Sequence, residues 1–265
     1  MCSFKNSEMQ RETPKFIRLK IRNGEFKANT SGFCPGFVQG NLVILPEKYA
    51  IDFHQFCLNN PAPCPLLSVT KSGVYQINDL GEDIDIRTDV PEYHIFINGE
   101  IKDTVSDIKH YWQDDFVTFI LGCSFSFEDA LIESGINIRN IEMNKNVSMY
   151  QTNIKAKSSK YFSSNYVVSM RPIKLNDVEK AIQITSKFQK AHGAPLHVGN
   201  AHEIGITDLS NPDFGDSVEV QEGEVPVFWA CGVTPQLAIK NAKLPFAITH
   251  VPGKMLITDK RYEDL

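Results

Sequence analysis

The fold is decided by residues 225–259, VPVFWACGVTPQLAIKNAKLPFAITHVPGKMLITD. The stretch predicts a strand over 225–230, a loop of small residues, a helix, and then a hairpin around Pro252 and Gly253. Thr234 suits the N-cap and Pro235 the first helical position, because proline has no N–H to leave unpaired. The loop would then face free amides at the positive end of the helix dipole, which can hold an anion. Any strand-to-helix connection in an α/β protein looks similar, so both interpretations stay open.

The composition is that of a globular protein with one large domain or two modest ones. The chain has 265 residues, of which 42% are hydrophobic and 22% charged. A net charge of -5 argues against nucleic acid as a partner. No apolar run approaches the roughly 18 residues of a membrane span, and the N-terminus lacks the apolar core of a signal peptide. We therefore expect a cytoplasmic protein with no membrane partner.

Six cysteines without a CxxC pair indicate reduced thiols rather than a disulfide framework or a structural zinc site. The chain also lacks the Rossmann GxGxxG, the P-loop GxxxxGK and the GxSxG nucleophile elbow. Common nucleotide-binding and hydrolase classes are therefore excluded, and no cofactor is expected.

The two flanks of the chain are typical of an α/β fold, with a core strand at 42–45, a helix from Pro46 and a strand at 66–69. The middle has a different order of elements. Residues 93–105 predict a hairpin around Asn98-Gly99, and two helices follow, the first over about 114–122 and the second capped by Ser124 or Ser126. Residues 136–143 then look strand-like, and a helix is expected over 176–188.

This order predicts an α/β fold: a mixed-sheet α/β domain with an inserted two-layer α+β domain and an active-site cleft between them. The expected boundaries are a flexible tail at 1–14, a discontinuous α/β domain formed by 15–91 and 190–265, and an inserted domain at 92–189.

Two loops resemble each other in physical type, Gly122-Cys123-Ser124-Phe125-Ser126 and Ala230-Cys231-Gly232-Val233-Thr234. Each offers a cysteine, a hydroxyl and small residues at a helix start, as a carboxylate cradle or oxyanion hole does. A cysteine at such a position would have a lowered pKa and could be a thiolate. The alternative is that both loops are simply small residues that pack well.

Charged residues at strand ends are further candidates for binding an anion. Arg87 and Asp89 lie two apart on a predicted edge strand, so both would point to one face. They form either a surface ion pair or an arginine clamp for a carboxylate, with the aspartate as its orienter. Arg171 stands before Pro172 at a strand end.

Histidines and aspartates supply candidates for proton transfer, namely His192, His250 and Asp216. The spacing of His192 and His197 is not the helical HExxH spacing, so a metal site is not predicted. Asp216 belongs to a Phe-Gly turn, where aspartate is usually a turn former.

Several long motifs together carry a family resemblance: TSGFCPGFVQGNLVILP, FILGCSFSFEDAL, HGAPLHVG, PDFGD, VPVFWACGVTPQ and PFAITHVPGKMLITD. They resemble the bacterial "putative hydro-lyase" family that is similar to the D-glutamate cyclase domain. The resemblance covers nearly the whole chain after about residue 15. It implies a lyase that eliminates water, with D-glutamate closing to 5-oxo-D-proline.

Glutamate cyclisation needs a neutral amine, a neutralised carboxyl group and a proton for the departing water. We expect one loop to anchor the α-carboxylate with help from Arg87 or Arg171, while the other activates the γ-carboxyl. The amine proton would go to His192, His250 or Asp216, and a thioester through Cys123 or Cys231 is the less favoured route. The predicted substrate-binding residues are Arg87, Asp89, Ser124, Ser126, Arg171, Gly232 and Thr234. A non-catalytic binder of a small acidic metabolite is the alternative, and a divalent metal such as Mn²⁺ and a homo-oligomer stay open.

Overall fold

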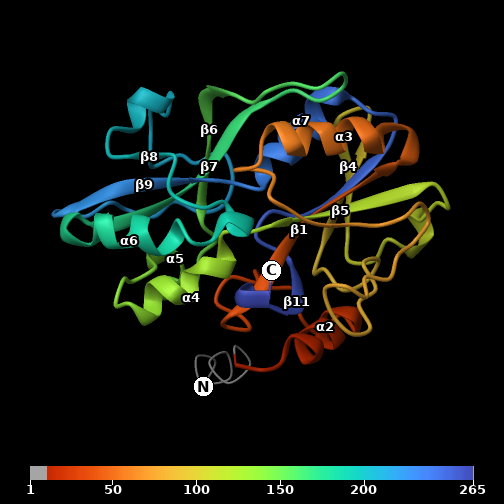
Figure 1. The fold of residues 1–265 in the computed structure, drawn as a ribbon, viewed down its shortest axis with the longest axis horizontal. Coiled ribbons are helices and arrows are strands. Elements are labelled where there is room, and N and C mark those ends of the chain that lie inside the picture. The colour runs from red at the N-terminus through yellow and green to blue at the C-terminus, as the bar shows by residue number, and fades with distance from the viewer. Residues whose placement is uncertain (1–10, 265) are drawn as a thin grey trace.

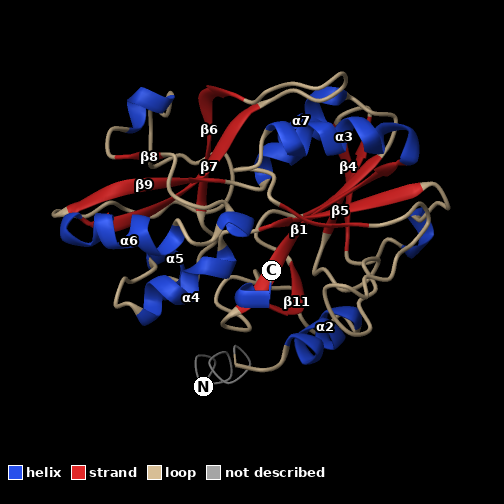
Figure 2. Ribbon diagram, in the orientation of Figure 1, coloured by secondary structure: helices blue, strands red, loops and turns tan. Residues whose placement is uncertain are grey.

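Two β-sheets form the framework of the protein in the computed structural model, which describes residues 11–264 (Figures 1 and 2). The predicted α/β class is confirmed. The sheets are not mixed, however, because every pairing between the described strands is antiparallel.

The larger sheet has the strand order β2-β5-β1-β10-β3-β4, with β11 also paired to β1. Its strands are β1 (Phe37–Pro46), β2 (Leu66–Val69), β3 (Tyr93–Ile97), β4 (Glu100–Val105), β5 (Phe116–Gly122), β10 (Ala247–His250) and β11 (Leu256–Arg261). Strands β1 and β5 pair from Gly40↔Gly122 to Pro46↔Phe116, and nearly all their residues are buried. This central pair is apolar on both faces because both faces are covered.

Helices cover one face of the larger sheet and irregular chain covers the other. Helices α3 (Glu47–Asn59) and α7 (Val233–Ala242) pack Phe53 and Ile239 against β1 and β5. On the opposite face, residues 77–93 contribute Ile84 and Ile86 to a second cluster with Leu42 and Ile120. Helix α2 (Pro14–Arg22) lies against β11, where Arg18 donates to the Ile257 carbonyl and to Asp259.

The smaller sheet has the order β6-β7-β9-β8 and stands at the left of Figure 1. Its strands are β6 (Ser148–Lys155), β7 (Asn165–Lys174), β8 (His197–Val198) and β9 (Glu224–Ala230). Helices α4 (Phe125–Glu133) and α6 (Val178–Thr185) bury Phe127 and Ala181 against Trp229, while α5 (Arg139–Glu142) lies beside α4. The other face is covered by the segment that contains Ile204 and Val218.

Within residues 11–264 the chain passes from one sheet to the other at only two points. The first crossing follows β5, where Cys123 and Ser124 lead into α4 on the smaller sheet. The second follows β9, where Cys231 and Gly232 lead into α7 on the larger sheet. We call residues 122–126 the 123 loop and residues 230–234 the 231 loop. The two predicted cradles are therefore the two crossing points of the fold.

These crossings correct the predicted domain boundaries. Strands β3, β4 and β5 lie inside the expected insert at 92–189 but pair within the larger sheet. Strands β8 and β9 lie outside that insert but pair with β7 or with each other in the smaller sheet. Of the predicted tail, residues 1–10 lie outside the described part. Thr13 is already the N-cap of α2, accepting from the Phe16 N–H.

Several predicted elements are wrong for identifiable reasons. The expected helix over 114–122 is strand β5, because its apolar run is buried on both faces, a pattern that a short buried helix shares. The expected edge strand that ends at residues 87–89 is instead a series of turns and bends that continues to residue 91, and residues 139–142 of the expected strand at 136–143 form α5. Strands β10 and β11 do not form a hairpin, since they pair with different halves of the same edge of β1.

None of the helices within residues 11–264 has both the length and the apolar character needed to cross a membrane.

Candidate functional site

The 123 loop and the 231 loop line one cavity, which we call the inner cavity. Its lining has five side chains with a polar atom and five apolar ones, together with two glycines: Asn41, Cys123, Ser124, His192 and Cys231; Phe125, Val147, Met149, Val233 and Met255; and Gly232 and Gly253. All of these residues are buried. The open space is about 10 Å³ for the centre of a water molecule, which is room for about one water. The site is therefore preformed and excludes bulk solvent.

Both crossing loops contain a glycine because another chain segment comes too close for a side chain. A Cβ on Gly122 would lie 1.6 Å from the Lys190 carbonyl oxygen, in the segment that leads to His192. A Cβ on Gly232 would lie 2.2 Å from Nδ2 of Asn41. Gly122 thus lets the Lys190 backbone approach its loop, and Gly232 lets the cavity residue Asn41 approach the other loop.

The two cysteines are neutral thiols, which corrects the prediction of a thiolate. Burial raises the pKa of Cys123 to about 12, although the Phe125 N–H acts in the opposite direction. Burial likewise raises the pKa of Cys231 to about 11 against the Val233 N–H. In both loops desolvation outweighs the amides of the helix start. The thiols are therefore poor nucleophiles at neutral pH.

A buried ion pair stands behind the 123 loop. Arg171 of β7 and Glu128 of α4 are fully buried, and the Arg171 Nη2 lies 2.5 Å from Oε1 of Glu128. The same Nη2 donates to Ser124 Oγ at 3.0 Å, and Ser31 donates to the second Glu128 oxygen at 2.7 Å. Because Ser124 accepts from the guanidinium, its own hydroxyl hydrogen is free to donate to a ligand. The Arg171 charge thus lies one hydrogen bond from the inner cavity.

His192 contributes a neutral imidazole to the cavity. Its Nδ1 lies 2.7 Å from the Ala62 carbonyl oxygen, an acceptor, so Nδ1 carries the proton and Nε2 is left as an acceptor. Burial lowers the pKa of His192 to about 4, and the charge of Arg171 also lowers it. The His192 imidazole is therefore uncharged at neutral pH and can accept a proton through Nε2.

His250 and Asp216, the other predicted proton acceptors, do not line the inner cavity. His250 lies in the core of the larger sheet, where its Nδ1 accepts from the Leu42 N–H at 3.0 Å. Burial lowers the pKa of His250 to about 4. The exposed Asp216 accepts from the Asn146 N–H at 2.8 Å and stabilises the turn that contains it.

Arg87 and Asp89 do not form the predicted clamp. Arg87 donates to Asp85 at 2.8 and 2.9 Å and stacks on Tyr75. Asp89 is buried and accepts two hydrogen bonds from Arg22 of α2, both at 2.8 Å. The two side chains separate because residues 85–88 form a turn rather than a strand.

Ser126 and Thr234 fix the loops to neighbouring strands. Ser126 Oγ accepts from the Gln39 N–H of β1 at 3.0 Å. Thr234 Oγ1 accepts from the Val167 N–H of β7 at 2.9 Å and donates to the Val167 carbonyl. Thr234 is not the predicted N-cap, because α7 begins at Val233 with Gly232 as its cap.

The sequence analysis missed Asn41 and Glu128. Asn41 donates to the Gly122 carbonyl at 2.7 Å and so joins β1 to the 123 loop. A polar residue directly before the apolar strand 42–45 was a usable indication. Glu128 looked like an ordinary acidic residue in the first turn of a helix, and only its pairing with Arg171 shows that it is buried.

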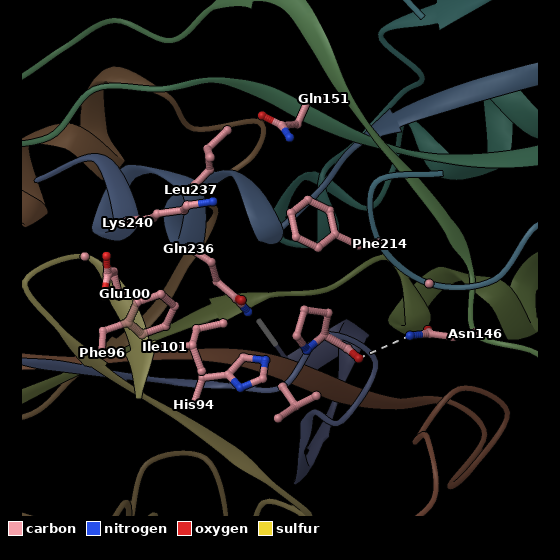
Figure 3. A pocket seen from close by; sticks show the side chains of 14 residues that line it. His94, Phe96, Glu100, Ile101, Asn146, Gln151, Phe214, Gln236, Leu237 and Lys240 are labelled. Atoms are coloured by element: carbon pink, nitrogen blue, oxygen red, sulfur yellow. Dashed lines mark hydrogen bonds between the residues drawn. The ribbon is translucent and has the colours of Figure 1, made fainter. Parts of the chain in front are cut away.

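Two larger cavities lie next to the inner one. The apolar cavity, about 540 Å³, opens between the β3–β4 hairpin, α7 and the loop at Phe214. Figure 3 shows Phe96, Ile101 and Phe214 around it, with the hydrogen bond from Asn146 to the Pro252 carbonyl at its base. The basic cavity, about 320 Å³, is lined by Lys27, Lys145 and Lys254 together with Asn29, Ser31 and Asn144.

The apolar and basic cavities are each lined by residues close in sequence to residues that line the inner cavity. Asn146 and Pro252 line the apolar cavity, and Lys145 and Lys254 line the basic one. Val147 and Gly253, which lie one or two residues from each of these pairs, line the inner cavity. Across residues 11–264, no group of three or more histidine, cysteine, aspartate or glutamate side chains is arranged to hold a metal ion.

Comparison with known proteins gives a family match over a segment of the chain that includes both loops. A family model described as D-glutamate cyclase matches residues 117–259. A protein of Shewanella woodyi named "Putative hydro-lyase" is 56% identical over 263 residues, which cover 99% of this chain and 97% of that protein. A protein of Aliivibrio fischeri with the same name is 56% identical over 246 residues, 93% of this chain and 92% of that protein. Arg171 and His192 also lie within the matched residues.

A nitrogen repressor-like protein from Methanococcus jannaschii has a similar trace at a TM-score of 0.43 and 10% identity. The similarity covers 96% of this chain and 97% of that one. It is too distant to support an argument about function.

Proposed function

Because this chain belongs to the D-glutamate cyclase family, whose curated bacterial relatives are named as hydro-lyases, we propose that it cyclises D-glutamate to 5-oxo-D-proline with loss of water. The observation that carries the proposal is the meeting of both crossing loops in one buried cavity with Arg171 behind it. Such a cavity can replace the water around one carboxyl oxygen by fixed donors.

The cyclisation needs the amine nitrogen to attack the γ-carboxyl carbon and one carboxyl oxygen to leave as water. Two protons leave the ammonium group and both end on the departing oxygen, so the reaction requires no other reactant. A group that accepts a proton and returns it is sufficient. His192 fits this task, because its Nε2 is unprotonated and lies in a site closed to bulk water.

The γ-carboxylate must also lose its negative character before a nitrogen can attack it. Ser124 can donate its free hydroxyl hydrogen to one carboxyl oxygen while it accepts from Arg171. The Arg171 charge would then stabilise the negative charge that develops on that oxygen. The 231 loop lines the same cavity and restricts the space in which the carboxyl group can turn.

A thioester route has little support from the two thiols. Their pKa values of about 12 and about 11 leave almost no thiolate at neutral pH. In addition, a free carboxylate is a poor acylating partner for a thiol. We therefore expect Cys123→Ser and Cys231→Ser to retain near-normal turnover.

The test is to incubate the purified protein with D-glutamate, with and without Mn²⁺, and to follow 5-oxoproline by NMR. We expect conversion of D-glutamate that is reduced at least a hundredfold in His192→Asn, the loss typical for removal of a general base. The exposed His202→Asn serves as the matched control. No loss of amine over a day under either condition would refute the cyclase.

The same preparation also tests the alternative, a binder of a small acidic metabolite without catalysis. Dicarboxylates and amino acids that raise the unfolding temperature identify ligands. A ligand that stabilises the protein but is recovered unchanged supports the binder.

A further inference from the structure

The basic cavity has a composition that nothing described so far uses. Three lysines from three separate segments line it: Lys27 follows α2, Lys145 precedes β6, and Lys254 lies between β10 and β11. No carboxylate is among the described residues of its lining. This concentration of positive charge stands out in a chain whose net charge is -5.

The neighbouring acidic side chains Glu92 and Glu128 neutralise only one of the three lysines. Glu92 pairs with Lys254 at 2.5 Å and so neutralises one ammonium. Glu128 lies behind Ser31, and its charge is matched by Arg171. Lys145 donates to the Ser217 carbonyl, a neutral acceptor that leaves the charge of the ammonium in place. Lys27 is exposed. The charges of Lys27 and Lys145 are therefore available to an anion.

We propose that the basic cavity binds a small dicarboxylate. Its volume of about 320 Å³ lies at the lower end of the range for small-molecule sites, which is roughly 300–1,000 Å³. Two available ammonium groups match two carboxylates, and the amides of Asn29 and Asn144 offer further donors and acceptors. The apolar cavity is the larger one, but most of its lining is apolar and offers less to a charged ligand.

The position of the basic cavity links it to the inner one. Ser31 of its lining donates to Glu128, Glu128 accepts from Arg171, and Arg171 donates to Ser124 of the inner cavity. The inner cavity has space for about one water molecule, so it can take a carboxyl oxygen but not a whole glutamate. The link to catalysis, unlike the dicarboxylate site itself, rests on the proposed function. In that case the basic cavity holds the acidic substrate, and an oxygen of one of its carboxyl groups reaches the inner cavity.

The experiment measures binding by isothermal titration with glutarate, D-glutamate and inorganic phosphate. We expect glutarate to bind the wild type more tightly than phosphate does, and Lys27→Gln/Lys145→Gln to weaken glutarate at least tenfold. Binding of glutarate should also weaken as salt is added. The control is Lys71→Gln, an exposed lysine after β2, which should bind as the wild type does.

Three results would overturn the proposal: no glutarate binding by the wild type, unchanged affinity in the double variant, or tighter binding of phosphate than of every dicarboxylate. Lys145 is partly buried, so its replacement can destabilise the fold. If the double variant unfolds, the single variant Lys27→Glu tests the site instead, because Lys27 is exposed and the change should weaken glutarate binding without disturbing the fold.

The outcomes are separable from those of the proposed function. Loss of glutarate binding in the lysine variants without any turnover by the wild type refutes the cyclase and retains the dicarboxylate site. Turnover by the wild type together with unchanged dicarboxylate affinity in the lysine variants supports the cyclase and refutes the dicarboxylate site.

Discussion

The 123 loop and the 231 loop each carry the chain from one sheet to the other, yet they are held in place by different forces. Behind the 123 loop stands the buried ion pair of Arg171 and Glu128, which reaches the cavity through Ser124. The 231 loop is held by neutral contacts, namely the Thr234 hydroxyl on β7 and the close approach of Gly232 to Asn41. The two loops have similar local sequences, but only the 123 loop is hydrogen-bonded to the buried ion pair.

This difference assigns separate tasks to the two sides of the inner cavity. A buried guanidinium interacts strongly with charge because little water screens it. A carboxyl group in the cavity is therefore stabilised more from the 123 side than from the 231 side. The 231 loop contributes shape, since Gly232 leaves room for the Asn41 side chain of the cavity lining to come close.

The largest expected effect comes from removing the charge behind the 123 loop. Arg171→Met leaves Glu128 as a buried carboxylate without its partner, which should lower the free energy of unfolding by about 3–5 kcal/mol. Urea denaturation measures this loss. The double variant Arg171→Met/Glu128→Leu should recover much of it, because no buried charge then remains. A loss below about 1 kcal/mol in the single variant would mean that the pair is far more hydrated than its burial indicates.

A second test uses pH to measure the environment of His192, which feels the same guanidinium. The pKa of His192 is lowered from 6.5 to about 4 in the folded protein. The unfolded chain therefore binds more protons between these values, and the stability from this group is complete above pH 6.5 and lost as the pH falls toward 4. The shift corresponds to about 3 kcal/mol.

The variant for this test is His192→Asn, because asparagine tolerates the left-handed backbone at φ 78 and can donate to Ala62. The free energy of unfolding should fall less steeply from pH 6.5 to 4 than in the wild type. His250, with a pKa also lowered to about 4, retains its share of the pH dependence in the variant. An identical slope in the variant and the wild type would contradict the assigned environment of His192.

The likeness of the two loops was predictable from the sequence, while their difference was not. A strand, a small-residue loop and a helix start are local features, and both loops showed them. The partners that distinguish the loops come from far along the chain. Arg171 lies 43 residues from Glu128, and Asn41 lies 81 residues from Gly122. Local patterns do not specify such pairs.

The errors in the predicted fold have the same origin. The helix predicted over 114–122 and the domain boundary at 92 failed together, because β5 pairs in the larger sheet and the first crossing follows it at the 123 loop. The boundary at 189 failed because β8 and β9 pair in the smaller sheet. The prediction of a lowered pKa for the two thiols was also wrong, because a helix start lowers a thiol pKa but complete burial raises it more. Burial depends on the whole fold and is poorly visible in a local motif.

The smallest expected effects compare one hydroxyl from each loop. Thr234→Val removes the acceptor of the buried Val167 N–H and should cost about 1–3 kcal/mol of unfolding free energy. Ser124→Ala should cost less, about 1 kcal/mol, because the Arg171 nitrogen that donates to Ser124 also donates to Glu128. Loss of the hydroxyl should therefore lower the free energy of unfolding more in the 231 loop than in the 123 loop.

The order should reverse for turnover of D-glutamate, because Ser124 lines the inner cavity and its hydroxyl can donate to a carboxyl oxygen, whereas the Thr234 hydroxyl is occupied on β7. Loss of a donor to a developing oxyanion lowers kcat by roughly 100-fold or more. Ser124→Ala should therefore fold well and turn over poorly, while Thr234→Val should be less stable and retain a near-normal kcat at low temperature. If both variants rank in the same order for stability and for kcat, the two loops do not divide the work, and the charge behind the 123 loop serves the fold alone.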